Sequence, residues 1–82
     1  PNDPQTHNYL GIACSRKGWQ QVAEQEVRKA IELNPNYGDA HFNLAVIYAT
    51  QNPPGKEMAR RHYNSAVQLG LPTDPELEKL LK

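Results

Sequence analysis

The sequence holds a single cysteine, Cys14, among its 82 residues, and this scarcity excludes two kinds of structure. One cysteine cannot form an intramolecular disulfide, and it cannot build a metal site that needs several thiolates. The sequence also lacks a signal peptide and any apolar run near the roughly 18 residues that a membrane-spanning helix needs. We therefore expect no membrane insertion by this segment. Localisation is left open, with the cytoplasm as the default.

The sequence has no excess of positive or negative charge. Nine Lys and Arg residues balance nine Asp and Glu residues, so the formal net charge is zero. Nucleic-acid binders and helices that lie on membranes usually need a surplus of basic residues, and we expect neither kind of partner. The sequence also offers no Gly-rich phosphate loop, paired carboxylates or Ser/His/Asp arrangement. It therefore predicts no enzyme, no catalytic residue, no metal site and no cofactor.

What the chain does contain is an internal repeat. His7 and His41 are 34 residues apart, and so are Leu10 and Leu44. Later pairs are 36 residues apart: Ala23 with Ala59, Val27 with Tyr63, Ala30 with Ala66, Ile31 with Val67 and Leu33 with Leu69. The two extra residues fall in the segment 51–55, whose Pro and Gly residues favour a turn that tolerates insertions.

Apolar residues recur at helical spacing within each repeat. We expect helices over about residues 4–17, 20–33, 39–51 and 55–69. Asp3 is the expected N-cap of the first helix, because an aspartate before a proline suits a helix start. Each helix pair is too short to be stable alone, so the pairs must stack to bury their apolar faces.

A fifth helix is expected over residues 73–82. The segment Thr73–Glu76 fits a capping box, or alternatively Asp74 is the N-cap with Pro75 at the first helical position. Its apolar stripe consists of Leu77, Leu80 and Leu81. One apolar side and one polar side suit a helix that covers the last repeat.

These features resemble the tetratricopeptide repeat, a helix–turn–helix of 34 residues with a W-x₂-L-G-x₂-Y…A-x₃-F…P pattern. In the first repeat the matching residues are Leu10, Gly11, Ala23, Val27, Ala30 and Pro35. In the second they are Leu44, Ala45, Tyr48, Ala59, Tyr63 and Ala66. The chain departs from the pattern at His7 and His41, which take the tryptophan position, and at Cys14, which takes the tyrosine position.

The resemblance implies an all-α fold, a right-handed α-solenoid of two antiparallel helix hairpins plus a capping helix. It divides a single domain, 1–82, into one repeat at 4–37, a second at 38–72 and the capping helix at 73–82. We also expect the chain to be part of a longer protein, with the array ending at the capping helix and further repeats before its first residue.

In this family the first helix of each repeat lines a concave groove that holds partner peptides, so the resemblance implies candidate binding residues. These are Gln5, Asn8, Tyr9, Ile12 and Arg16 from the first repeat, and Asp39, Phe42, Asn43, Val46 and Thr50 from the second. Asn8 and Asn43 suit hydrogen bonding to a peptide backbone. Ile12, Phe42 and Val46 offer an apolar floor. The alternative is that these three apolar residues only pack against a neighbouring repeat.

One specific ligand is rejected on the residues present. Some relatives bind the acidic tails of chaperones through a clamp of Lys, Asn and Arg side chains. Asn8 and Ile12 stand where this clamp needs lysine and asparagine, and only Asn43 matches. Without the lysine, carboxylate recognition loses its charge-assisted hydrogen bonds.

We expect the histidines, the cysteine and the tryptophan to have structural roles and no role in catalysis or metal binding. A metal site at His7 and His41 has no evident third ligand, so we expect both to fill the space between paired helices. Cys14 is expected to fill a small core position. His62 is expected on a solvated outer face, and Trp19 is expected to seal the first helix pair.

The sequence therefore predicts a scaffold module that binds a protein or peptide of unknown identity. The alternative is a structural module that stacks on other repeats or associates with itself through the face of its N-terminal helix. A third reading, a targeting arm for an enzyme elsewhere in the parent chain, stays open.

Overall fold

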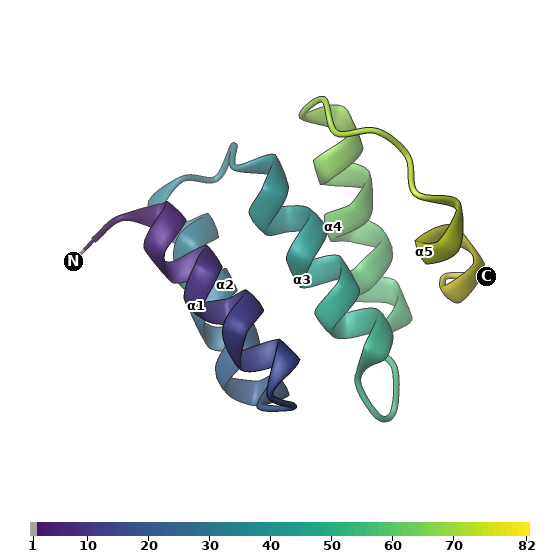
Figure 1. Ribbon diagram of the computed structural model, residues 1–82. Coiled ribbons are helices and arrows are strands. Elements are labelled where there is room, and N and C mark those ends of the chain that lie inside the picture. Colours follow the sequence, from purple (N-terminus) through teal and green to yellow (C-terminus); the bar gives the residue numbers. More distant parts are fainter. Residues whose placement is uncertain (1) are drawn as a thin grey trace.

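The computed structural model describes residues 2–82, so Pro1, which the expected domain includes, lies outside the description. Within this range the chain forms five helices: α1 (Pro4–Arg16), α2 (Gln20–Leu33), α3 (Gly38–Thr50), α4 (Lys56–Gln68) and α5 (Pro75–Leu80). Helices α1 and α2 form one hairpin, α3 and α4 form a second, and α5 follows at the end of the row (Figure 1). Residues 2–82 contain no strand. The predicted all-helical solenoid is confirmed.

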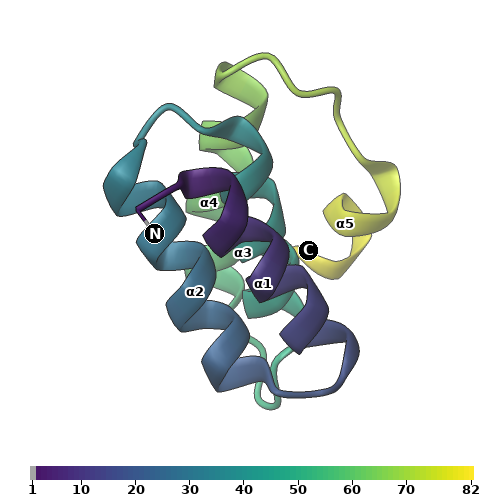
Figure 2. The same ribbon diagram turned by 60° about the vertical axis from the view of Figure 1, so that its left-hand side comes forward.

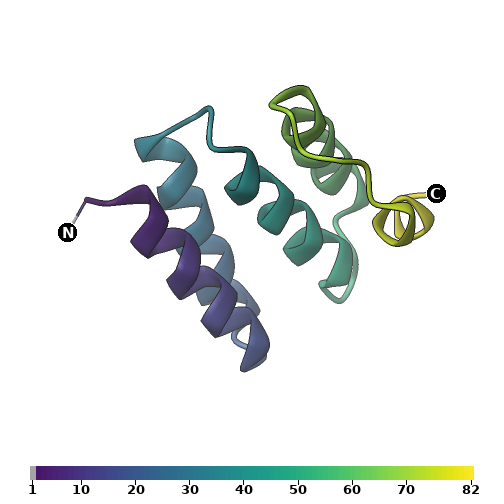
Figure 3. The ribbon, with the colours of Figure 1, turned by 45° about the horizontal axis from the view of Figure 1, so that its top comes forward.

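The helices form two layers. Figure 2 shows α1, α3 and α5 on one side of the molecule and α2 and α4 on the other. Figure 3 shows the two hairpins side by side, with α5 beyond the second hairpin. Helix α2 packs against α3 and so joins the hairpins, while α1 and α5 each touch α3 on opposite sides. We call the side formed by α1, α3 and α5 the α3 face.

Aspartates begin the two helices that start with proline. Asp3 accepts a hydrogen bond from the backbone N–H of Gln5 at 3.2 Å. At α5, Oδ1 of Asp74 accepts from the backbone N–H groups of Glu76 and Leu77 at 3.0 and 3.2 Å. Each cap satisfies donors that the first turn of a helix leaves unpaired. Of the two starts predicted for the last helix, the one with Asp74 as N-cap is present.

The core is built on small residues where helices approach closely. Six alanines have no exposed surface: Ala23, Ala30, Ala40, Ala45, Ala59 and Ala66. The largest fully buried side chains are Leu44 and Val27. Gly11 lies against Val27, and a methyl group added there would collide with the valine side chain and lie 3.1 Å from the carbonyl oxygen of Ala23. The repeat pattern places small residues here because the two helices of a hairpin leave no space for larger ones.

Polar contacts from α4 hold α5 in place. The hydroxyl of Tyr63 donates to Oε2 of Glu78 at 2.6 Å and accepts from the backbone N–H of Asp74 at 2.9 Å. Nε of Arg60 donates to the carbonyl oxygen of Leu81 at 2.8 Å. This attachment fixes the segment 71–74, which links α4 to α5, along the edge of the α3 face.

The apolar stripe of α5 is narrower than the sequence predicted. Leu77 and Leu81 are buried, but Leu80 is 49 % exposed. Leu77 and Leu81 are four residues apart and point in nearly the same direction, whereas Leu80, three residues after Leu77, lies at the border of the face that they share. Including Leu80 in the buried stripe was wrong.

Candidate functional site

Two hollows open on the α3 face, one on each side of α3. The first lies between α1 and α3 and has a volume of about 130 Å³. Its lining residues are Ile12, Ser15 and Arg16 from α1 and Asn43, Val46 and Ile47 from α3. We call it the inter-hairpin hollow. It combines an apolar floor, one amide and one guanidinium.

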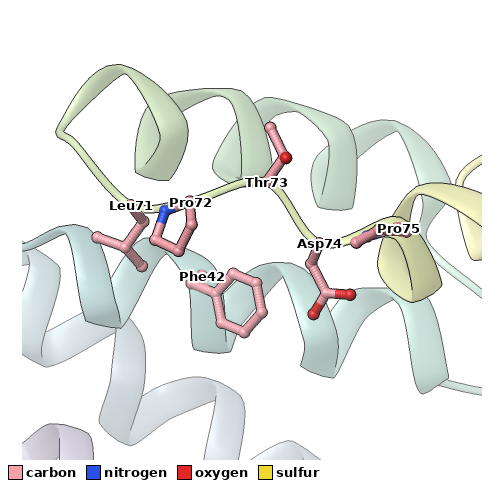
Figure 4. Close-up of a pocket in the computed structure, with 6 residues that line it drawn as sticks. All are labelled: Phe42, Leu71, Pro72, Thr73, Asp74 and Pro75. Carbon is pink, nitrogen blue, oxygen red and sulfur yellow. The ribbon is translucent and has the colours of Figure 1, made fainter.

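The second hollow lies between α3 and the segment that leads into α5, and its volume is about 350 Å³. We call it the tail hollow. Its lining residues are Phe42, Leu71, Pro72, Thr73, Asp74 and Pro75. Figure 4 shows the Phe42 ring on one side of this hollow, with the chain from Leu71 to Pro75 passing opposite.

Helical spacing places the two hollows next to each other. Phe42 and Val46 are four residues apart on α3, so their side chains lie on one face, a single turn from each other. Phe42 lines the tail hollow and Val46 lines the inter-hairpin hollow. Both side chains are half-buried and pack against the core at their bases. This strip of α3 therefore separates the hollows and borders both.

The structure brings five of the ten sequence-predicted residues to these hollows. Ile12, Arg16, Asn43 and Val46 meet in the inter-hairpin hollow, and Phe42 lies in the tail hollow. The other exposed candidates lie apart from them. Gln5 lines a separate hollow with Asp3, Pro4, Asn34 and Tyr37, Thr50 lines another near Gln51, and Tyr9 and Asp39 are exposed and line neither hollow.

Asn8 does not face a partner, and the expectation that it does was wrong. Its side chain is 2 % exposed. Its Oδ1 accepts from Nδ2 of Asn43 at 3.0 Å, and its Nδ2 donates to the hydroxyl of Tyr37 at 3.4 Å. A buried amide must find partners inside the protein, and here it links α1 to α3. Burial raises the pKa of Tyr37, whose phenol stays neutral beside Asn8.

His62 is not on a solvated face, so this expectation was also wrong. Its Nδ1 lies 3.0 Å from Nδ1 of His41, and its ring stacks on those of His41 and Tyr48. Nε2 of His41 lies 2.8 Å from the carbonyl oxygen of Pro35. A carbonyl only accepts, so Nε2 of His41 carries a hydrogen, and in the neutral ring Nδ1 then accepts from His62. Burial, and then the neighbouring His41 and Arg28, lower the pKa of His62.

The two equivalent histidines have separate partners. Nδ1 of His7 lies 2.8 Å from Oε1 of Glu26, which joins α1 to α2. His41 instead bonds to His62 and to the carbonyl of Pro35. Among residues 2–82 no three His, Cys, Asp or Glu side chains are grouped so that they could hold a metal ion.

Trp19 does not seal the first helix pair, contrary to expectation. Its ring is 57 % exposed, and Nζ of Lys17 lies 5.4 Å from the ring centroid. The left-handed backbone of Gly18, with φ of 85°, turns the chain so that the indole lies outside the hairpin.

Sequence reasoning missed the wall of the tail hollow, residues 71–75. The only local signal was the presence of Pro72 and Pro75 in a segment without helical periodicity, which favours an extended chain. That Phe42 faces this segment depends on how α5 docks, and α5 is held through Tyr63 and Arg60 on α4. No spacing within one helix encodes that arrangement.

The two matched hairpins and the small-residue core define a helical-repeat protein, and comparison with known sequences identifies the family. The profile of the tetratricopeptide repeat family matches residues 27–68, half of the chain, and the chain belongs to this family. Members of the family typically interact with other proteins and have no catalytic activity of their own.

Among curated proteins, the chain is similar to the type IV pilus assembly protein PilF of Pseudomonas aeruginosa. The two are 34 % identical over 58 residues, which make up 71 % of this chain and 22 % of that protein. The matched segment thus spans about a fifth of the length of PilF. Separately, no helix within residues 2–82 has the length and apolar character needed to cross a lipid bilayer.

Proposed function

We propose that this chain is a non-enzymatic scaffold module that binds an extended segment of a partner protein across α3. The observation that carries the proposal is that both hollows border one turn of α3, at Phe42 and Val46. A peptide chain advances about 3.3 Å per residue when extended, so a short segment can reach from one hollow to the other. Every second side chain of an extended segment points to the same side, so two such side chains would occupy the two hollows.

The inter-hairpin hollow supports this proposal because its polar groups are arranged for peptide contacts. Asn43 is half-buried, and its Nδ2 is used by Asn8, so its amide is held in a fixed orientation. Its Oδ1 can accept from a peptide N–H group. Arg16 is exposed at the end of α1 and can donate to a carbonyl or a carboxylate. A fixed amide loses little conformational entropy on binding.

The test is peptide capture by two matched double variants. Phe42→Ala with Val46→Ala removes the strip between the hollows, whereas Val22→Ala with Met58→Ala removes two partly exposed apolar side chains from α2 and α4. An array of random decapeptides is probed with the wild type, and the binders are retested by fluorescence anisotropy. We expect the first variant to lose most binding and the second to keep it, with helicity checked by circular dichroism. Equal binding by both variants, or no binding by the wild type, rules the proposal out.

The similarity to PilF supports a first choice of natural partner. Because that relative is named as a type IV pilus assembly protein, we propose components of a pilus assembly apparatus as the first proteins to test. Their overlapping peptides can be placed on the same array, and strong, Phe42-dependent binding of one of them is the supporting result.

A second candidate function, stacking through the outer face of α1, is favoured by a comparison between the repeats. Leu10 and Leu44 occupy equivalent positions, but Leu10 is 47 % exposed and Leu44 is 1 % exposed. Ala13 is likewise exposed, while its equivalent, Ile47, is buried. Helix α2 covers that face of α3, so the same face of α1 is suited to another helix.

Light scattering over a concentration series tests this second candidate. If α1 mediates self-association, the apparent mass rises with concentration, and Leu10→Lys returns the protein to a monomer. A wild type that stays monomeric throughout the series argues against self-association through α1.

A further inference from the structure

The tail hollow has a chemical character that selects among peptides. Four of its six lining residues are apolar: Phe42, Leu71, Pro72 and Pro75. Asp74 is the only charged residue of the six. Figure 4 shows its carboxylate beside the Phe42 ring, on the side of the hollow next to α5. An apolar surface with one carboxylate at its edge favours an apolar side chain next to a cation.

Asp74 keeps one oxygen available for such a cation. Its Oδ1 accepts both hydrogen bonds that cap α5, from Glu76 and Leu77. Within residues 2–82 no group donates a hydrogen bond to Oδ2 and no ion pair includes Asp74. The cap also fixes the orientation of the carboxylate, because both bonds go to rigid backbone donors.

Two basic residues of α4 near α5 are engaged by the end of the chain. Arg60 donates to the carbonyl oxygen of Leu81, and Nζ of Lys56 donates to the backbone oxygen of Lys82 at 3.0 Å. Asp39, one helical turn before Phe42 on α3, is exposed and adds negative charge on this side. The lining of the tail hollow therefore carries one negative charge and no positive charge, whereas the inter-hairpin hollow contains Arg16.

The wall of the tail hollow also has few donors. Pro72 and Pro75 have no backbone N–H group, and the backbone N–H of Asp74 is used by Tyr63. The free polar groups on this wall are the backbone N–H and hydroxyl of Thr73, together with carbonyl oxygens and the Asp74 carboxylate, which only accept hydrogen bonds. Acceptors predominate, so the wall suits a partner that supplies donors. Lysine and arginine do so, and they carry the charge that Asp74 complements.

We propose that the tail hollow binds an apolar side chain of the partner peptide, and that Asp74 pairs with a lysine or arginine adjacent to it. This inference rests on the proposed peptide binding across α3 and adds the class of sequence that is bound. Because Arg16 lies in the other hollow, the charges also give the peptide a direction, with its basic part at α5.

The test uses the binders from the random decapeptide array. Each binder is resynthesised with its basic residues changed singly to glutamine and to glutamate, and the dissociation constants are measured by anisotropy. We expect binders to carry Lys or Arg next to an apolar residue. Changing that basic residue to glutamine should weaken binding about 2- to 5-fold, as for a partly exposed ion pair, and the effect should shrink at high salt.

Two matched variants assign the effect to Asp74. Asp74→Asn keeps a good N-cap but removes the charge, while Glu76→Gln removes the same charge from the exposed side of α5, outside the hollow. We expect Asp74→Asn to bind the lysine and glutamine peptides equally and Glu76→Gln to discriminate between them as the wild type does.

The outcomes separate this inference from the function on which it rests. If peptides bind and require Phe42 and Val46 but carry no basic preference, or if both charge variants behave alike, the role of Asp74 is overturned and peptide binding stands. If the wild type binds no peptide in the array, both proposals are overturned.

Discussion

The Nδ1 atoms of His41 and His62 lie 3.0 Å apart, and the two rings stack with their centroids separated by 5.2 Å. Their hydrogen bond requires at least one neutral ring, because one of the two Nδ1 atoms must accept. His62 also lines a hollow that contains three other titratable side chains, the guanidinium of Arg28, the carboxylate of Glu32 and the phenol of Tyr48. The pair joins α3 to α4 and should respond to pH.

Acid should destabilise the fold through His62. Its pKa is lowered below 6.5 in the folded state, so the unfolded chain takes up this proton at a higher pH than the folded chain does. The stability that His62 contributes is therefore fully present above about pH 6.5 and is lost as the pH falls below it. Thermal unfolding at a series of pH values measures this trend.

The variant His62→Asn isolates this contribution. Asparagine can place an amide donor near the position of Nδ1 without titrating. We expect the variant to lose less stability than the wild type between about pH 7.5 and about pH 5.5. Parallel curves for the two proteins would show that the acid sensitivity arises elsewhere.

Asn8→Ala should lower the free energy of unfolding by about 1–3 kcal/mol, because it leaves the donor of Asn43 and the phenol of Tyr37 without a partner. Urea denaturation measures the loss. Asn64→Ala on the exposed side of α4 is the matched control and should be nearly neutral. A neutral Asn8→Ala variant would mean that water replaces the amide and that the link between the hairpins is weak.

Ala30→Leu or Ala66→Leu should each cost about 1–3 kcal/mol, since both alanines have no exposed surface and a larger side chain must displace its neighbours. Ala13→Leu adds the same atoms to an exposed position of α1 and should change stability little. Denaturant midpoints of the three variants, measured at low protein concentration, provide the comparison. An equal loss at all three positions would contradict close packing as the cause.

Tyr63→Phe should loosen α5. The substitution removes the donor to Glu78 and the acceptor for the backbone N–H of Asp74. The bond to Glu78 favours the neutral phenol and raises the pKa of Tyr63, so the phenol remains a donor through the neutral range. We expect faster amide hydrogen exchange in residues 74–81 and unchanged exchange in α1 and α2. Tyr9→Phe, at a phenol that is 64 % exposed, should leave α5 unaffected.

The helices and the small-residue core could be predicted from the sequence because their determinants are local. Asp3 and Asp74 precede prolines, and the alanines recur at a fixed repeat distance. These signals act within one helix or one hairpin, where helical spacing alone decides which residues face each other. The repeat boundaries at 4–37 and 38–72 remain a prediction.

The errors concern contacts between hairpins. Asn8 and Asn43 are 35 residues apart and meet only because α1 packs beside α3. From the sequence, both amides looked equally suited to a partner. The sequence also misplaced His62. Its neighbours along α4 are charged, which suggested a solvated position, but in the folded protein its ring packs against His41 of α3. Polar residues that satisfy each other across an interface cannot be distinguished by pattern from those that face a ligand.

Arg60 holds α5 by a main-chain oxygen, that of Leu81, to which its Nη2 also donates. Every residue type carries that oxygen, so the contact does not depend on which side chains α5 presents outward. Glu76, Lys79 and Leu80 are exposed and can diverge among related proteins without undocking the helix. Helix α5 can thus acquire new surface chemistry by simple substitution, and it offers a position for attaching reporters that leaves both hollows unobstructed.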